Sequence, residues 1–398
     1  MRQKHIAHIT TLTNWGGIER LLLDFLFSSC NGDLKHILVT TSSSPSLIKL
    51  VLEKNISWFQ PQNPFRYDPR KINAIGKYLR RKRIDLVHSY NAHGNAWAYL
   101  ALLITRNSIP LITGERGSIW FVRPPMRWLD RLAQRKARMI ITNSNASAFM
   151  LMKYYGISSS KIHVIYNGIQ RPQCYSRERA RSELRIPQGI KVVGSIGRLD
   201  SPKDYWTLID AAALFLKKRH DVMFVIIGGG PQEAFLNDQV IKKGISDRFY
   251  FTGWRANARE LIAAFDLYVS TSVHESFGNT LIEAAFLEKA VIASDVDGVP
   301  EAVVNNVTGI LLKPTSPLRK VSCKGASPYP QKVICQGKFQ ATRSLSPQSL
   351  ADTINELIDD NEQAERMGRR GRERAEEQFS LNRYIKKLNE IYSNILTV

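Results

Sequence analysis

The chain has 398 residues, 43% of them hydrophobic, which suffices for two domains with sizeable cores and excludes a disordered polypeptide. Its formal net charge of +21 favours a polyanionic partner. The longest apolar run, at residues 96–104, is shorter than the roughly 18 residues that span a bilayer, and no signal-peptide core follows the basic start. The cysteines have no metal-ligand spacing, so we expect reduced thiols in a cytoplasmic protein. They are Cys30, Cys174, Cys323 and Cys335.

Short apolar runs alternate with helical patterns along the chain. Strands separated by roughly 10–20 residues of helical pattern indicate parallel sheets with helices on both faces, so the fold class is α/β. A polar stretch at residues 170–185 divides the pattern into two halves, and we place an interdomain linker there. The predicted strands are residues 5–10, 37–40, 86–88, 111–113, 139–142 and 162–165 in the first half, and 191–195, 223–227, 249–252, 267–270, 290–293 and 309–312 in the second.

The first motif in chain order is the pair Gly16 and Gly17. It follows the first predicted strand and precedes a helix that we expect at residues 18–27. Glycines at this place let the backbone approach a phosphate closely, although a simple tight turn would need the same residues.

Two further strand ends in the first half carry polar side chains. His88 and His93 stand at and after the end of the third strand, where either could face a ligand or fill the core. Glu115 and Arg116 end the next strand, and we interpret them as candidates for lining an acceptor site.

Positive charge is concentrated in the N-terminal half. Residues 1–190 hold 29 lysines and arginines against 10 aspartates and glutamates, a net charge of +19. Two segments carry much of it, at residues 66–83 and 119–138. The asymmetry predicts that this half faces something polyanionic.

The second basic segment has arginines at every fourth residue beside aromatic residues. Cations next to Trp and Phe are typical of a helix that lies in a membrane interface. A solvated arginine-rich helix and a nucleic-acid surface are the alternatives, but the chain has no recognisable nucleic-acid module. The residues are Arg123, Arg127, Arg131 and Arg135, with Trp120, Phe121 and Trp128 nearby and Pro124 and Pro125 at the expected helix start.

The second half opens with a buried strand pattern, a glycine turn and two cations five residues apart, Arg198 and Lys203. A guanidinium can fork onto phosphate oxygens, and an ammonium adds a point charge. Basic residues in loops are usually only solvated. Arg198 and Lys203 indicate a binding site only if a second element that binds anions or sugars lies beside them.

That second element holds Glu275 and Glu283 in one short segment. A loop that ends at Gly278 leads into a helix, whose N-terminus offers unpaired N–H groups and partial positive charge to a phosphate. Asn279 and Thr280 could cap this helix or donate to phosphate oxygens. A carboxylate accepts two hydroxyl hydrogen bonds, which suits a sugar or a ribose diol. An ordinary amphipathic helix with a surface glutamate at each end is the alternative.

Together these motifs resemble family 4 of the retaining glycosyltransferases, whose two-Rossmann architecture is called GT-B. The resemblance covers nearly the whole chain, strongly in the C-terminal half and loosely in the N-terminal half. It rests on segments that occur in the family's order, namely residues 15–20, 166–169, 197–198 with Lys203, 227–231, 251–253, 275–283, 298–301 and 308–309.

The GT-B resemblance implies two Rossmann-like, doubly wound domains that face a cleft, with a C-terminal helix that crosses back to the N-terminal domain. We place an acceptor-binding domain at residues 1–170, a nucleotide-sugar-binding domain at residues 171–380 and the crossing helix at residues 381–398. Residues 314–347 depart from the family pattern, because they are long, basic and without periodicity. We interpret them as an inserted, mobile loop.

The resemblance also implies roles for single residues. Glu283 would hold the ribose diol and Glu275 the sugar hydroxyls, while Arg198 and Lys203 would stabilise the leaving diphosphate. His93, near the sugar, would complete the catalytic set with Glu275, Arg198 and Lys203. The donor site as a whole would consist of Gly16, Gly17, Arg198, Lys203, Gly253, Glu275, Ser276, Phe277, Gly278, Asn279, Thr280 and Glu283.

Asp295 and Asp297 spell the metal-binding pattern of a different glycosyltransferase fold. They follow a late strand here, and we interpret the match as coincidental. We therefore expect neither a metal nor another cofactor.

The predicted function is retaining transfer of a hexose or N-acetylhexosamine from a nucleotide-diphosphate sugar, with UDP favoured over GDP. The predicted acceptor is a saccharide, lipid-linked on a polyprenyl carrier, in the synthesis of a cell-surface polysaccharide such as lipopolysaccharide or capsule. The basic half predicts peripheral binding to the inner face of an anionic membrane. A sugar-nucleotide epimerase of the same fold and a non-catalytic protein that binds anionic lipid or nucleic acid are the alternatives.

Overall fold

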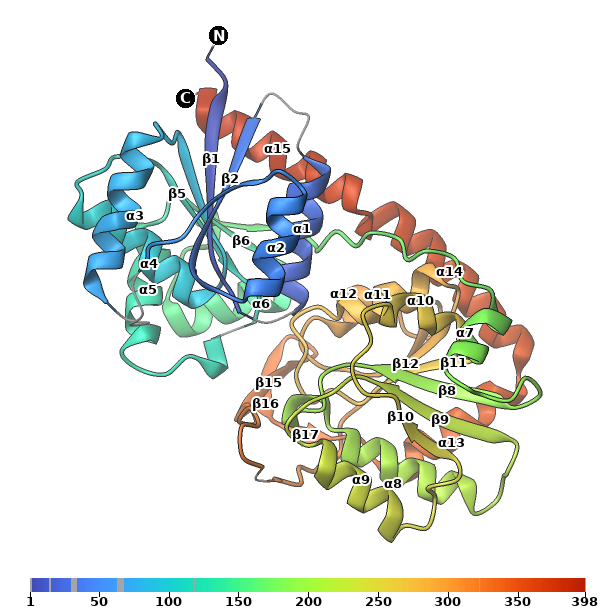
Figure 1. Ribbon diagram of the computed structural model, residues 1–398. Helices are drawn as coiled ribbons and strands as arrows, with labels where there is room; N and C mark the ends of the chain where they lie inside the picture. Colours follow the sequence, from blue (N-terminus) through green and yellow to red (C-terminus); the bar gives the residue numbers. More distant parts are fainter. Residues whose placement is uncertain are drawn as a thin grey trace. The chain divides into compact units, whose positions relative to one another are not determined.

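The computed structural model describes residues 2–13, 16–29, 34–62, 68–117, 119–321 and 323–397. Trp15, Cys30 and Arg66, which the sequence motifs include, lie outside the described residues, as does the side chain of Trp120. The chain divides into two compact units (Figure 1). Unit 1 comprises residues 1–170 with 381–398, and unit 2 comprises residues 171–380.

Unit 1 is built on a seven-stranded parallel sheet in the order β3-β2-β1-β4-β5-β6-β7. All six strands predicted in this half are confirmed, whereas β3 was missed because three residues are too few to show a period. The strands are β1 (Lys4–Leu12), β2 (Leu34–Ser43), β3 (Ser57–Phe59), β4 (Leu86–Ser89), β5 (Leu111–Glu115), β6 (Met139–Thr142) and β7 (Ile162–Val164). The helices among them are α1 (Gly17–Ser28), α2 (Pro45–Glu53), α3 (Pro69–Arg81), α4 (Asn91–Ile104), α5 (Met126–Lys136) and α6 (Asn145–Met150).

The last helix of the chain, α15 (Leu381–Thr397), belongs to unit 1. Its buried side chains recur at helical spacing and join the core of this unit, so the helix buries one apolar face there. They are Leu381, Tyr384, Leu388, Tyr392 and Ile395.

Unit 2 is built on a six-stranded parallel sheet in the order β10-β9-β8-β11-β12-β13. All six predicted strands are confirmed here. They are β8 (Lys191–Ile196), β9 (Val222–Ile227), β10 (Phe249–Phe251), β11 (Leu267–Ser270), β12 (Ala290–Ser294) and β13 (Gly309–Leu312). The helices of this unit are α7 (Arg177–Glu183), α8 (Tyr205–Leu216), α9 (Glu233–Lys242), α10 (Ala258–Leu261), α11 (Asn279–Phe286), α12 (Val299–Ala302), α13 (Pro347–Asp359) and α14 (Asn361–Phe379).

The polar stretch at residues 170–185 is not a linker throughout. The division between the units falls after residue 170, and α7 is part of unit 2. Ala180 and Arg181 on this helix are buried, although their surroundings in the sequence are strongly polar. The polar composition concealed a short helix because Arg181 finds hydrogen-bond partners in the interior of the unit.

The two sheets share one topology. Each runs outward in both directions from a central strand, so the strand order reverses between β1 and β4 in unit 1 and between β8 and β11 in unit 2. Figure 1 shows helices on both faces of each sheet. Ligands of doubly wound sheets bind at the carboxyl ends of the strands, where the order reverses. The loops after these four strands are therefore the expected places for chemistry.

The prediction of a mobile loop at residues 314–347 is wrong. β14 (Ser316–Pro317) pairs with β17 (Arg343–Ser344), and β15 (Lys332–Cys335) forms an antiparallel hairpin with β16 (Lys338–Ala341). Val333, Ile334 and Leu345 are buried. The sequence did not reveal these strands because none is longer than four residues.

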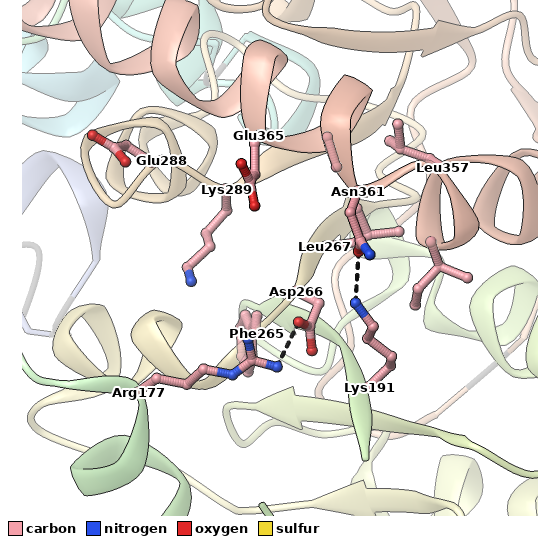
Figure 2. Close-up of a pocket in the computed structure, with 12 residues that line it drawn as sticks. Arg177, Lys191, Phe265, Asp266, Leu267, Glu288, Lys289, Leu357, Asn361 and Glu365 are labelled. Atoms are coloured by element: carbon pink, nitrogen blue, oxygen red, sulfur yellow. Dashed lines mark hydrogen bonds and ion pairs between the residues drawn. The ribbon is translucent and has the colours of Figure 1, made fainter. Parts of the chain in front are cut away.

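Asp266 joins α7 to the sheet of unit 2, and Figure 2 shows it facing Arg177. The Arg181 side chain, 0% exposed, donates to Asp266 Oδ2 at 2.9 Å and to the Ala264 carbonyl at 3.2 Å. The Val192 N–H donates to the same carboxylate at 2.7 Å. An aspartate that pairs with a buried guanidinium is expected to be important for stability.

We expect Asp266→Ala to lower the free energy of unfolding of unit 2 by about 3–5 kcal/mol, because the buried Arg181 charge would lose its counter-charge. Urea unfolding of the variant and the parent measures this difference. The matched control is Asp238→Ala, which removes an exposed ion pair with Lys242 and should cost less than about 1 kcal/mol. Equal small losses from both variants would contradict the assignment.

Candidate functional site

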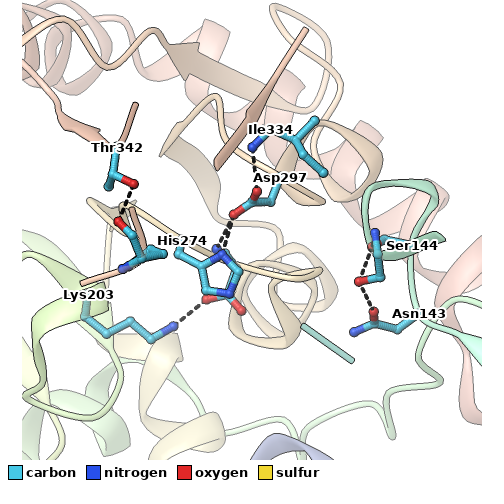
Figure 3. Close-up of polar contacts among 10 residues, drawn as sticks. Asn143, Ser144, Lys203, His274, Asp297, Ile334 and Thr342 are labelled. Atoms are coloured by element: carbon cyan, nitrogen blue, oxygen red, sulfur yellow. Dashed lines mark hydrogen bonds and ion pairs between the residues drawn. The ribbon is translucent and has the colours of Figure 1, made fainter. Parts of the chain in front are cut away.

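A lysine and a glutamate meet where the strand order of unit 2 reverses. Lys203 follows β8, Glu275 follows β11, and these two strands are hydrogen-bonded neighbours. The Lys203 ammonium forms an ion pair and a hydrogen bond with Glu275 Oε2. Figure 3 shows Lys203 with a dashed line at its ammonium. The sequence predicted both residues for the site but not this direct contact.

The backbone holds the Lys203 loop against the Glu275 loop. Lys203 ends a short 3-10 helix, Ser201–Lys203, and its carbonyl accepts from Thr271 Oγ1 at 2.9 Å. The Val273 N–H donates to the Pro202 carbonyl at 2.9 Å. These bonds fix the backbones on both sides of the ion pair, so the two charged side chains are preorganised.

Asp297 organises the loop that carries Glu275. Its Oδ2 accepts from His274 Nδ1 at 2.6 Å and from the Glu275 N–H at 3.2 Å (Figure 3). The Gly298 N–H donates to the Glu275 carbonyl at 3.1 Å, and a Cβ at Gly298 would lie 2.1 Å from the Ser276 carbonyl oxygen. Asp297 is thus a structural acceptor in this loop, and only glycine fits at the next position.

The helix that follows this loop begins after a glycine. Gly278 is its N-cap, with φ 97°, a left-handed conformation that glycine adopts without strain. Because the N-cap is a glycine, neither Asn279 nor Thr280 is the capping residue, and donation from their side chains to phosphate oxygens stays a prediction. The first turn of α11 therefore follows a glycine N-cap, and the positive end of its helix dipole favours an anion there.

Glu283 lies on α11 and is buried, as Phe277 is on the preceding loop. It pairs with Arg259, whose Nε lies 3.8 Å from Glu283 Oε1. Glu275 is also largely covered, with a side chain 19% exposed. The alternative of an amphipathic helix with a surface glutamate at each end is therefore wrong, because neither carboxylate is a solvated surface group.

The electrostatics of the site favour a charged lysine. Burial lowers the pKa of Lys203, but the charge and hydrogen bond of Glu275 outweigh burial, and the pKa of Lys203 is raised above its ordinary value. Arg198 has a side chain 56% exposed, with Nε 3.4 Å from Asp200 Oδ2. The loop after β8 thus offers one fixed ammonium and one accessible guanidinium for an anion.

Gly253 lies at the same edge of the sheet but farther from the point of reversal. It follows β10, the outermost strand on that side, and has φ 69°. Its carbonyl accepts from the Gly228 N–H at 3.0 Å, and a Cβ on Gly253 would meet no atom within 4 Å. The structure therefore places Gly253 beside the loop after β9 and does not bring it to the Lys203–Glu275 pair.

The predicted site residues of unit 1 lie where its own strand order reverses. Gly16 is the N-cap of α1, Gly17 begins that helix, and half-buried His93 lies in the first turn of α4, which follows β4. A Cβ on Gly16 would lie 2.6 Å from Glu19 Oε2. Burial raises the pKa of Glu19, and its bonds to backbone N–H groups of Gly16 and Glu19 oppose this. An anion at this helix start would compete with the Glu19 carboxylate, a contact that sequence reasoning missed.

Three other candidates of unit 1 are core residues. Fully buried His88 shares a hydrogen bond of 2.6 Å with Tyr392 on α15. Glu115 is fully buried, and Arg116 donates to Asn167 and, at 3.0 Å, to the Tyr384 hydroxyl. The interpretation of Glu115 and Arg116 as lining an acceptor site is therefore wrong, because both belong to the interior of unit 1.

The arginines on and before α5 divide into two kinds. Arg131 and Arg135 donate from Nε to the Tyr155 carbonyl at 3.1 and 3.3 Å. Their guanidinium groups therefore hold the backbone of unit 1. Arg127 is exposed, and so is Trp128, at 63%. Among the described helices none is both long and apolar enough to cross a membrane.

A separate pocket of about 300 Å³ lies in unit 2 (Figure 2). It is lined by Lys191 and Leu267, which begin β8 and β11, and by Lys289, just before β12. Burial lowers the pKa of Lys289 to about 8. The pocket is thus at the amino ends of the strands, whereas Lys203 and Glu275 follow the carboxyl ends. It is not the site that the topology predicts.

Each half of the chain matches a family of known proteins. The family described as Glycosyltransferase Family 4 matches residues 15–171, and the family described as Glycosyl transferases group 1 matches residues 176–319. The alpha-maltose-1-phosphate synthase of Mycobacterium tuberculosis is 27% identical over 365 residues, covering 83% of this chain and 87% of that protein. The O-antigen biosynthesis glycosyltransferase WclY of Escherichia coli is 26% identical over 57% of this chain and 65% of its own length.

A solved structure shows the same fold. Anabaena HepE, in complex with UDP-glucose, superposes with a TM-score of 0.80 at 22% identity, covering 98% of this chain and 99% of that one. The predicted GT-B fold is therefore confirmed. Each half of the chain matches its own family model, in the order that the sequence motifs implied. The chain belongs to the group 1, family 4 glycosyltransferases.

Proposed function

We propose that the protein is a retaining, metal-independent glycosyltransferase that moves a hexose or N-acetylhexosamine from a nucleotide-diphosphate sugar to a saccharide acceptor. One observation carries the proposal. Lys203 and Glu275 form a half-buried ion pair at the loop that leads into the N-terminus of α11, where the strand order of unit 2 reverses. A cation, a carboxylate and the positive end of a helix dipole together suit a sugar diphosphate.

The roles follow from the chemistry of each group. Arg198, Lys203 and the first turn of α11 stabilise the negative charge that grows on the leaving diphosphate. Glu275 accepts from sugar hydroxyls and orients the ring, and Glu283 holds the ribose diol. The acceptor hydroxyl attacks from the face of the leaving group, and a donor phosphate oxygen takes its proton. His93 of unit 1 is proposed to contact the sugar.

Metal independence is proposed because this chain has its own positive charges for the diphosphate. Lys203 keeps its proton at neutral pH, since Glu275 raises its pKa. Asp297, the second acid of the Asp295–Asp297 pattern, already accepts from His274, Glu275 and Ile334. These bonds leave it poorly placed for an ion.

The donor base and the acceptor are proposed from the relatives. HepE was solved with UDP-glucose, which supports UDP over GDP. WclY is named for O-antigen biosynthesis, which supports a saccharide acceptor in cell-surface polysaccharide assembly. A polyprenyl carrier for this acceptor is part of the proposal. Exposed Arg127 and Trp128 on α5, with the exposed basic residues at the end of α3, support peripheral binding to an anionic membrane on its inner face.

Thermal unfolding with a panel of UDP, GDP, ADP and their sugars, in a chelator, tests the donor site. A ligand that binds only the folded state raises the Tm, and we expect a rise with one nucleotide series. Lys203→Ala should abolish this rise in Tm. Lys242→Ala, which changes the exposed last residue of α9, should leave the rise unchanged. No rise with any nucleotide, with or without added Mg²⁺, would contradict the proposal.

Product analysis separates the alternatives. Release of a changed sugar nucleotide without an acceptor would identify an epimerase. A gel shift with nucleic acid that weakens with salt, combined with no nucleotide-sugar binding, would favour the non-catalytic alternative.

A further inference from the structure

The segment between β13 and α13 contacts both loops of the proposed donor site. We name residues 314–346 the insertion. The match to the group 1 family ends at residue 319, so most of the insertion lies beyond it. Ser327 binds Asp200, which precedes Lys203, and Ile334 binds Asp297, which supports Glu275. A short stretch of chain therefore connects the supports of both charged groups.

The contact between Ser327 and Asp200 affects how tightly Asp200 holds Arg198. Asp200 is 4% exposed and caps the 3-10 helix by accepting from the Ser201 N–H at 2.9 Å. Ser327 donates to it twice, from its N–H at 2.7 Å and from its hydroxyl at 2.6 Å. A carboxylate offers about four acceptor positions, and these bonds occupy three of them. Arg198 is left with a contact of 3.4 Å and a largely exposed guanidinium.

A second contact of the insertion is made by Ile334, which binds Asp297. The Ile334 N–H donates to Asp297 Oδ1 at 2.8 Å, and the Asp297 N–H donates to the Ile334 carbonyl at 2.7 Å. Figure 3 shows Ile334 and His274 on opposite sides of the Asp297 carboxylate. Ile334 itself is buried. The insertion thereby helps to hold the carboxylate that orders the Glu275 loop.

A third contact involves the loop after β9. Tyr329 lies close to Gln232 and Ser201, which oppose the rise that burial causes in the pKa of Tyr329. Gln232 in turn donates to Ser201 Oγ at 3.2 Å. The insertion is thus attached at several points to the edge of the sheet where the donor would bind.

We propose that the insertion is a positioning element of the donor site and that Ser327 is its key residue. By satisfying Asp200, Ser327 keeps that carboxylate from capturing Arg198, so the guanidinium is available to the donor diphosphate. This inference rests on the proposed function. The geometry that carries it is the pair of hydrogen bonds from Ser327 to Asp200 beside a loosely held Arg198.

A double-mutant cycle tests the proposal, with UDP and UDP-glucose as probes in calorimetric titrations. Ser327→Ala should weaken binding about tenfold, the range expected when a hydrogen bond to a charged group is lost. Ser327→Thr should bind like the parent because it keeps the hydroxyl. In the Asp200→Asn background, Ser327→Ala should change the Kd less than about twofold, since no charge remains to attract Arg198.

The control is Thr342→Val. Thr342 Oγ1 donates to the Pro330 carbonyl at 2.6 Å, inside the insertion, and to neither Asp200 nor Asp297. This variant should keep the parent's Kd, whereas a general loosening of the insertion would weaken binding in both variants. A Ser327→Ala loss of the same size in both Asp200 backgrounds, or no loss at all, would overturn the inference.

The result also separates the inference from the proposed function. If the parent binds UDP and Lys203→Ala does not, but Ser327→Ala binds like the parent, only the role of the insertion is wrong. If the parent binds no nucleoside diphosphate, both are wrong.

Discussion

Replacing Glu275 by glutamine is expected to lower kcat about 10²- to 10³-fold while changing the Kd of the nucleoside diphosphate only a few-fold. Glutamine keeps the shape but loses the charge, so the Lys203 ion pair is lost together with the strong acceptor for sugar hydroxyls. Steady-state kinetics with the donor identified by thermal unfolding, together with titration of the free nucleotide, separate the two effects.

Glu283 provides the comparison for Glu275. Glu283→Gln should mainly raise the KM for the donor and the Kd of the nucleotide, because its proposed partner is the ribose and not the reacting sugar. Its burial beside Arg259 means that the folded state of this variant must be verified by urea unfolding. Equal and small effects from both glutamine variants would show that the role assignment is wrong.

Unit 1 is expected to lose stability in mild acid because its core contains a chain of neutral histidines. His8 Nε2 lies 2.9 Å from His36 Nδ1, and His8 Nδ1 lies 2.9 Å from the Tyr90 hydroxyl. The same hydroxyl lies 3.1 Å from His88 Nδ1. Burial lowers the pKa of His36 to about 4 and holds the pKa values of His8 and His88 well below their usual range.

The direction of the effect follows from the proton balance. An unfolded histidine titrates near 6.5, so between pH 6.5 and 4 the unfolded state binds more protons than the folded state. The contribution of the neutral histidines to the free energy of unfolding is therefore fully present above about pH 6.5 and decreases as the pH falls below that value. His36 alone accounts for about 3 kcal/mol of this loss between pH 7 and pH 4.

Hydrogen exchange measured by mass spectrometry between pH 7 and pH 4.5, corrected for the intrinsic exchange rate, tests this expectation. Protection should fall more in peptides from β1, β4 and α15 than in peptides from β8 and β11. A His36→Gln variant, which keeps a hydrogen-bonding side chain but cannot titrate, should show a shallower fall. An equal loss of protection in both units, unchanged by the variant, would contradict the role of the histidines.

The sequence alone determined the architecture of this protein and pointed to the loops of the proposed donor site. Strand positions were predictable because each buried strand of a parallel sheet is a continuous apolar run between turn residues. The segments with Arg198, Lys203, Glu275 and Glu283 were identifiable because glycine turns, charged residues and a helix start follow such runs directly. These are local signals, and the sequence contains them without knowledge of any distant contact.

Only the tertiary structure decided which distant residues meet. Lys203 and Glu275 are 72 positions apart, and Asp200 and Ser327 are 127 positions apart. Periodicity describes near neighbours along the chain and contains no information on such pairs. The same limit explains why His88, Glu115 and Arg116 looked like site residues, although the packing of α15 and the neighbouring strands makes them core. It also explains why the insertion looked like a loop, since its strands have at most four residues and pair with one another, while Ser327 and Ile334 bind the distant Asp200 and Asp297.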